Sequence, residues 1–279
     1  MKGIYHLSAL KPLTKSSFWL VGIAVGLTAI YKTLLWRSGD RAHLGISILF
    51  GLAVASLLWE KRRSLNLETD LVSIFFGTLF MSWILWQSTD SIEDNTLRIL
   101  PFISALALGL IASGYKGLKQ YWQELTILFF LGVPSVLLSF LIDLSPFTAK
   151  FSAFLLWLSG FQVSLQGVEV NLPTGGIRVY SGCSGIESMT YVLGLAVICL
   201  VMFPIKRSQQ IFVPIVAVIL GFVVNGFRVA LLAVLSVSNN EAAFDYWHEG
   251  NGSLIFGAIA VLAFGLFYLF LLRQSEPEH

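Results

Sequence analysis

The chain has 279 residues, of which 56% are hydrophobic and 12% are charged, and its mean hydropathy is +0.78. The charged share is about half that of a typical soluble domain, and the charges stand in short clusters between long apolar runs. This composition excludes a soluble globular protein. The net charge of +2 and the lack of one basic stripe argue against a nucleic-acid partner. The sequence therefore predicts an integral membrane protein, with lipid as its main surroundings.

Eight apolar runs are predicted to cross the membrane as helices. A helix rises about 1.5 Å per residue, so each run covers most of a hydrocarbon core of about 30 Å. The runs are residues 18–36, 44–59, 71–86, 99–114, 125–142, 186–203, 211–237 and 254–272. The predicted fold class is an all-α polytopic membrane protein, with residues 1–279 forming a single integral membrane domain of about eight transmembrane helices.

The basic residues predict the orientation of these helices, because Lys and Arg are retained on the cytoplasmic side. Eleven of the 18 basic residues fall on one side of the membrane if both termini are cytoplasmic. They are Lys2, Lys11, Lys15, Lys61, Arg62, Arg63, Lys116, Lys119, Lys206, Arg207 and Arg273. We therefore expect a multi-pass protein of the plasma (inner) membrane with cytoplasmic N- and C-termini.

Residues 147–182 are predicted to lie on the outer side of the membrane without crossing it. The run 147–161 is short, contains Lys150 and has apolar residues at helical spacing, which predicts an interfacial helix. In residues 162–180, apolar residues alternate with period two between turn signals, which predicts a small β-meander before the sixth span. Open strands in lipid would leave backbone groups unpaired, so we expect the meander to rest on the outer surface.

Cys183 opens the sixth predicted span, in the motif Cys183-Ser184-Gly185. The dipole and free N–H groups at a helix start favour a thiolate, and glycines on both sides allow another backbone to approach the sulfur. The position suits a nucleophile, but it also suits a small packing residue or half of a disulfide. The other cysteine, Cys199, lies on the same predicted helix at about 24 Å, which excludes a disulfide if that helix is continuous.

Asn225 and Arg228 share one face of the seventh predicted span. An arginine inside the membrane costs at least about 2.5 kcal/mol unless a partner or water meets it, so Arg228 is a candidate functional residue. The alternative is an ion pair with Glu187, which lies one turn after Cys183. The two roles are compatible, and Glu187 and Asn225 are therefore candidate supporting residues.

His248, one of four histidines, lies in the outer loop before the last span. Together with Cys183 and Arg228, it supplies the side chains that acyl transfer requires. Residues 183–272, which carry all three, are therefore the predicted catalytic three-helix segment. Cys183 would attack a peptide carbonyl, His248 would act as general acid and base, and Arg228 would stabilise the developing oxyanion. No cofactor or metal is predicted, because His248-Glu249 lacks a second histidine at helical spacing and the chain has no cysteine pair.

These motifs resemble the exosortase/archaeosortase family of multipass membrane cysteine transpeptidases, and within it the cyanobacterial cyanoexosortases of the A type. The similarity rests on Cys183-Ser184-Gly185, Asn225-x-x-Arg228 and His248 in that order, and it covers about residues 133–272. The first four spans resemble the family only in hydropathy. The resemblance implies a Cys/Arg/His site that cleaves C-terminal sorting signals of the PEP-CTERM type from exported proteins and transfers the new C-terminus to a surface acceptor.

Such a signal has a Pro-Glu-Pro motif, a hydrophobic helix and a basic tail. We expect Arg178 and Arg228 to meet its glutamate near the outer surface. The sequence leaves open which nucleophile accepts the product and whether an accessory membrane protein takes part. Two other functions remain as alternatives. A multipass transporter would also hold Arg228 and Glu187 in the membrane, but no internal repeat is visible. A scaffold of an export machinery would tolerate Cys183→Ala.

Overall fold

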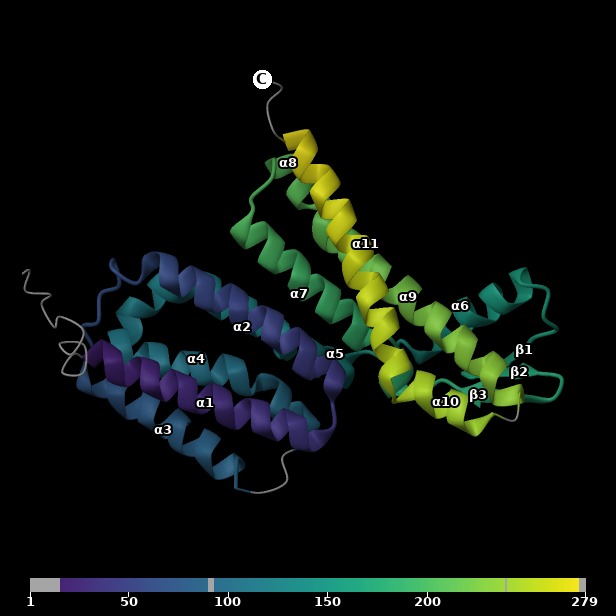
Figure 1. Cartoon of the computed structure of the whole chain (residues 1–279), viewed down its shortest axis with the longest axis horizontal. Helices are drawn as coiled ribbons and strands as arrows, with labels where there is room; N and C mark the ends of the chain where they lie inside the picture. The colour runs from purple at the N-terminus through teal and green to yellow at the C-terminus, as the bar shows by residue number, and fades with distance from the viewer. Residues whose placement is uncertain (1–15, 90–92, 239, 276–279) are drawn as a thin grey trace, which may run out of the picture. The chain divides into compact units, whose positions relative to one another are not determined.

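The computed structural model describes residues 16–89, 93–238 and 240–275 (Figure 1). Lys2, Lys11 and Lys15, which contribute to the predicted orientation, lie outside the described residues. The chain divides into two compact units. The first contains Met1–Asp40 and Val54–Leu128, and the second contains Arg41–Ala53 and Phe129–His279. Two helices, α2 (Arg41–Lys61) and α5 (Trp122–Leu141), therefore contribute residues to both units.

The first unit is a group of apolar helices connected by polar loops. It contains α1 (Ser16–Ser38), the second part of α2, α3 (Leu71–Gln87), α4 (Asp94–Gly117), η2 (Leu118–Tyr121) and the start of α5. α3 packs closely on α4, since a Cβ added at Gly77 would lie 2.6 Å from Ile111. Lys61 forms an ion pair of 2.6 Å with the buried Glu124, which ties the end of α2 to the start of α5.

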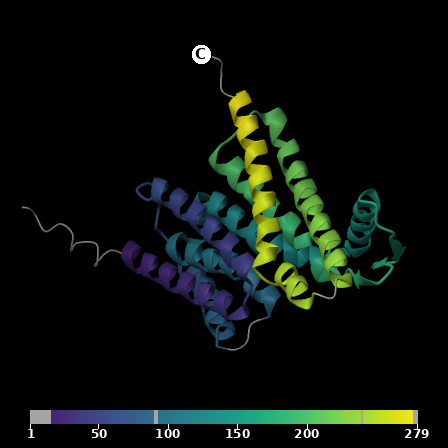
Figure 2. The ribbon, with the colours of Figure 1, turned by 45° about the vertical axis from the view of Figure 1, so that its right-hand side comes forward.

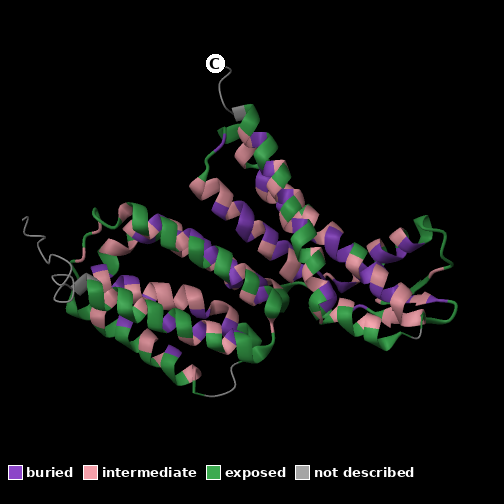
Figure 3. Cartoon of the chain, in the orientation of Figure 1, coloured by how far each residue is buried: buried purple, intermediate pink, exposed green. Residues whose placement is uncertain are grey.

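The second unit holds the remaining elements, arranged around α9. They are α6 (Ser145–Leu158), β1 (Ser164–Gln166), β2 (Glu169–Leu172), β3 (Gly175–Arg178), η3 (Ser181–Cys183), α7 (Ile186–Met202), α8 (Arg207–Gln210), α9 (Phe212–Val237), α10 (Glu241–His248) and α11 (Asn251–Ser275). α9 packs against α6, α7 and α11, and it runs beside α11 in Figure 2. α7 and α9 carry many buried residues (Figure 3), as expected of helices that are surrounded by other helices.

The strands form one antiparallel sheet in the order β1-β2-β3. β2 and β3 pair with Val170 opposite Ile177, and β1 and β2 pair with Leu165 opposite Val170. Val170, Leu172 and Val179 point into a core shared with small residues of α6 and α9. The sheet thus has one face buried against helices and one more exposed face, and the predicted β-meander is confirmed.

All eight predicted spans fall on helices, and the predicted fold class is confirmed. Six helical stretches of the described residues are long and apolar enough to cross a membrane. One of them, Asp94–Leu141, has 48 residues and a break at Gly114, so its length of about 72 Å accommodates two crossings. The shorter apolar helix α3 has 17 residues and covers the predicted span 71–86. The chain is a multi-pass membrane protein.

The predicted helix over residues 147–161 is present as α6, shifted slightly towards the N-terminus. Small residues form the face of α6 that packs inside the unit, and Ser152 Oγ donates to the Gly226 carbonyl oxygen at 3.0 Å. Phe147, Phe154 and Trp157 are exposed. Large apolar side chains on the outer face and small ones inside are the pattern expected of a helix that contacts lipid. Its position on the outer membrane face stays a prediction.

Candidate functional site

The turn that carries Cys183 is held by hydrogen bonds from two helices. Cys183 ends η3, and Gly185 adopts a left-handed conformation (φ 88°) before α7 begins. Asn225 on α9 donates to the Cys183 carbonyl oxygen at 3.0 Å, and Thr148 on α6 donates to the Ser184 carbonyl oxygen at 2.7 Å. A Cβ at Gly185 would lie 2.8 Å from the Asn225 amide nitrogen, so the motif needs glycine for its φ angle and for space.

The structure brings together the predicted nucleophile and the predicted acid-base residue. The Sγ atom of Cys183 lies 3.7 Å from Nε2 of His248. Cys183 is buried, and the His248 side chain is 18% exposed. The His248 ring packs on Phe244 with a centroid distance of 5.2 Å, and its Nδ1 lies 3.6 Å from Oε1 of the exposed Glu249. A thiol and an imidazole at this separation suit proton transfer with a small adjustment.

Tyr180 is a site residue that the sequence analysis did not single out. Its hydroxyl oxygen lies 3.3 Å from Nε2 of His248, so both Tyr180 and Cys183 approach the same ring nitrogen. The pKa of Tyr180 is raised to about 12, mainly because the phenol is partly buried and secondly because of its interaction with the neighbouring Cys183. The hydroxyl therefore stays protonated at neutral pH and can donate a hydrogen bond. The sequence could have indicated this role, because Tyr180 lies at the end of the meander, three residues before Cys183.

Arg228 contacts the main chain of His248. Its Nη2 atom donates to the His248 carbonyl oxygen at 2.5 Å, and its buried Nε atom has no hydrogen-bond partner among the described residues. The guanidinium thus fixes the end of α10, where the imidazole is attached. The guanidinium also places a positive charge beside the main chain of His248.

Glu187, the other candidate partner of Arg228, accepts a hydrogen bond of 2.6 Å from the Tyr191 hydroxyl. That hydroxyl also lies 2.7 Å from Nδ1 of His43, which is fully buried on α2. Glu187 therefore bonds to Tyr191, whereas Arg228 bonds to the main chain of His248. His43 was missed because it lies directly before the predicted span 44–59, in the part of the chain that resembles the family only in hydropathy. A histidine next to an apolar run is itself a signal.

A cavity of about 250 Å³ lies beside Cys183 and His248. Its wall includes the end of β3 and the following residues, with Arg178 and Tyr180, and residues Phe244 and His248 of α10. Val229 and Leu232 of α9 contribute apolar surface. Arg178 thus shares a cavity with the thiol and the imidazole, whereas Asn225, Glu187 and Arg228 do not line it.

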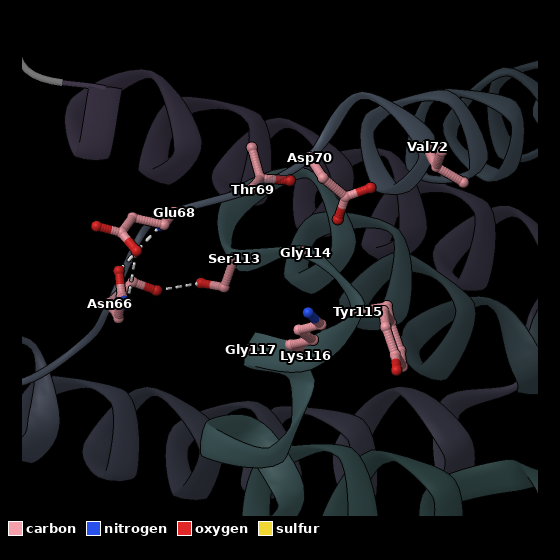
Figure 4. Close-up of a pocket in the computed structure, with 10 residues that line it drawn as sticks. All are labelled: Asn66, Glu68, Thr69, Asp70, Val72, Ser113, Gly114, Tyr115, Lys116 and Gly117. Atoms are coloured by element: carbon pink, nitrogen blue, oxygen red, sulfur yellow. Dashed lines mark hydrogen bonds between the residues drawn. The ribbon is translucent and has the colours of Figure 1, made fainter.

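A larger cavity, of about 740 Å³, lies in the first unit between residues 66–72 and the break in α4 (Figure 4). Its described lining contains no cysteine or histidine. Asp70 accepts hydrogen bonds from the backbone N–H and the hydroxyl of Ser73, which lower the pKa of its carboxyl group. Ser113 donates to the Asn66 carbonyl oxygen at 2.6 Å. These hydrogen bonds cap α3 and hold the break in α4 in place.

Both cysteines are free, so Cys183 is not half of an intramolecular disulfide. Within the described ranges, no group of three or more His, Cys, Asp or Glu side chains is placed to hold a metal ion. The chemistry that the cavity offers is therefore that of a thiol beside an imidazole, with a phenol and a guanidinium close by.

The sequence of the chain matches the model of one protein family, described as transmembrane exosortase (Exosortase_EpsH), over residues 36–265. The chain belongs to this family. The match includes Cys183, Arg228 and His248, and it also covers the second to fourth spans, beyond the region of the resemblance seen in the sequence motifs. Neither the curated proteins nor the solved structures contain a protein that matches the chain. The assignment of this exosortase to the cyanoexosortase A subtype stays a prediction.

Proposed function

We propose that this exosortase is a membrane-embedded cysteine transpeptidase that cleaves C-terminal sorting signals of exported proteins. The observation that carries the proposal is the separation of 3.7 Å between Cys183 Sγ and His248 Nε2 in the wall of a cavity. A catalytic thiol needs a base within hydrogen-bond reach and space for a carbonyl group, and both are present here.

The reaction follows from the positions of these groups. His248 Nε2 takes the proton of the Cys183 thiol, and the thiolate adds to the carbonyl carbon of the scissile peptide bond. The C–N bond then breaks as Nε2 returns this proton to the leaving amine, which leaves a thioester on Cys183. An acceptor amine attacks the thioester and gives its proton to His248, and the Cys183 thiolate leaves and regains a proton. Water in place of the amine would give hydrolysis.

Negative charge builds up on the carbonyl oxygen during both additions. The Tyr180 hydroxyl reaches the same part of the cavity and donates a hydrogen bond to this oxygen. Arg228 supplies positive charge and holds the His248 turn through its bond to the carbonyl oxygen of that residue. Glu249 stabilises the imidazolium form of His248, at a modest strength because the Glu249 carboxylate is 82% exposed.

The substrate that suits this site is a sorting signal of the PEP-CTERM type, as the family resemblance implies. Its hydrophobic helix would enter between the spans from the lipid, and its acidic motif would meet the exposed Arg178 at the cavity. With both termini cytoplasmic, the cavity opens on the extracytoplasmic side, where an exported protein arrives. The acceptor is a nucleophile of the cell surface.

The test is processing of a co-expressed exported protein that carries a Pro-Glu-Pro sorting tail. We expect cleavage with the native chain and none with Cys183→Ala. Cys199→Ala is the matched control, because Cys199 is the second free cysteine and does not line the cavity. Cleavage that persists in Cys183→Ala would overturn the proposal and return the transporter and scaffold functions to consideration.

A further inference from the structure

The backbone of β3 has one side that no strand of the described residues occupies. β2 lies on one side of β3, and β3 is the last strand of the sheet. An outer strand presents unpaired N–H and C=O groups, which can pair with another extended chain.

The register identifies which backbone groups face outward. Val179 N donates to the Val168 carbonyl oxygen at 2.9 Å, which continues the register in which Val170 lies opposite Ile177. In an antiparallel pair, hydrogen-bonded and non-hydrogen-bonded residue pairs alternate. Ile177 is therefore bonded to β2, whereas the N–H and C=O groups of Arg178 point away from β2. In the part of the chain that the structure describes, neither group has a hydrogen-bond partner.

The outer edge of β3 runs from a start that lies close to α9 to an end at the cavity. At its start, a Cβ added to Gly175 would lie 3.1 Å from Val237, so the end of α9 packs against a face of the strand there. At its other end, Arg178 is exposed and lines the cavity that also contains Cys183 and His248. Phe244 and His248 of α10 also line this cavity. The open backbone groups thus lie at the catalytic cavity.

We propose that the open edge of β3 at Arg178 binds the substrate segment around the scissile bond as an added antiparallel strand. This inference rests on the proposed function. One substrate residue exchanges two hydrogen bonds with the N–H and C=O groups of Arg178, and the next residues extend past Tyr180 towards Cys183.

This binding mode requires an extended substrate segment and gives a rule for its side chains. Successive side chains of a strand point to opposite faces of the sheet. The substrate residue opposite Arg178 lies on the same exposed face as the guanidinium, where a carboxylate is favoured. Its neighbours on either side point to the face shared by Val179, Val229 and Leu232, where uncharged side chains fit.

The test is disulfide trapping between Arg178→Cys and single cysteines placed in turn along the substrate segment. The enzyme also carries Cys183→Ala and Cys199→Ala, so the substrate stays uncleaved and no other thiol reacts. Paired residues in this register have Cα atoms about 5.5 Å apart, which suits a disulfide. We expect trapping at alternate substrate positions, with at least about 5-fold less at the positions between them, because their side chains point away. Thr174→Cys, in the exposed turn before β3, is the matched control and should trap weakly without alternation.

Equal trapping at consecutive positions, or the same pattern with Thr174→Cys, would overturn the inference. A second measurement uses the unaltered enzyme and synthetic substrates with one N-methylated amide. Methylation at the residue opposite Arg178 should lower kcat/KM about 10-fold, and methylation at the next residue about 2-fold or less. Equal effects would also overturn the inference, while failure of the proposed function would be seen separately as cleavage by Cys183→Ala.

Discussion

The side-chain amide of Asn225 donates a hydrogen bond of 3.0 Å to the carbonyl oxygen of Cys183. This bond joins α9 to the turn that carries the nucleophile, and Asn225 is buried. A buried carbonyl group that loses its donor costs about 1–3 kcal/mol. Asn225 therefore acts on the reaction through the position of Cys183, without lining the cavity.

Replacing Asn225 with leucine should destabilise the protein by about 1–3 kcal/mol, because the Cys183 carbonyl would stay buried without a donor. Thermal unfolding of the purified protein in detergent measures this loss. Phe227→Leu is the control, since Phe227 is an exposed neighbour on the same helix. Equal unfolding temperatures for Asn225→Leu and the native protein would show that the bond contributes nothing.

Tyr180→Phe should lower the rate of thioester formation about 100-fold, as expected for one lost hydrogen-bond donor to an oxyanion. The folded pKa of Tyr180, about 12, lies above the ordinary value of 10, so the hydroxyl is protonated below about pH 9. The loss should then be the same from about pH 6 to 9, and the limbs of the pH profile should not move. A shifted limb would mean that Tyr180 acts through the titration of Cys183 or His248.

Arg228→Lys should lower cleavage at least about 10-fold, and Arg228→Ala should lower it further. Lysine keeps the positive charge but lacks the planar fork that reaches the His248 carbonyl oxygen. Arg207→Lys, on α8 and away from the cavity, is the control. Full activity of Arg228→Lys would show that charge alone is needed and that the bond to His248 is not.

Tyr191→Phe should destabilise the second unit by about 1–2 kcal/mol, because its hydroxyl contacts both Glu187 and His43. We expect the reaction of Cys183 with an alkylating reagent to change less than about 2-fold, since Tyr191 lies outside the cavity. Unfolding and alkylation measured on one preparation separate the two effects. A large fall in alkylation without loss of stability would assign Tyr191 to the site itself.

The sequence predicted the helices and the sheet well because their signals are local. Apolar runs define the spans, and the period-two alternation before Cys183 defines the strands. The proximity of Cys183 and His248 followed from placing both on the outer side of the membrane. Their approach to 3.7 Å depends on the packing of α10 beside α9, which no local pattern encodes.

Contacts between distant segments were the part that sequence reasoning missed. The pair of His43 and Tyr191 joins α2 to α7 across 148 positions of the chain. Tyr180 looked like the last residue of a strand, and its hydroxyl gains a role only because α10 brings His248 to it. The contact between Arg228 and the His248 carbonyl is of the same kind, since a backbone acceptor leaves no residue-type signal.

Detection of the thioester on Cys183 is the decisive test of the proposed mechanism. Membranes that contain the enzyme and a Pro-Glu-Pro substrate are treated with hydroxylamine, and the new C-terminus of the substrate is analysed by mass spectrometry. We expect a hydroxamate at the cleavage site with the native chain and with Cys199→Ala, and none with Cys183→Ala or Cys183→Ser. A hydroxamate formed by the Cys183→Ala protein would overturn the mechanism. Cleavage by the native chain without any hydroxamate in excess hydroxylamine would overturn it as well.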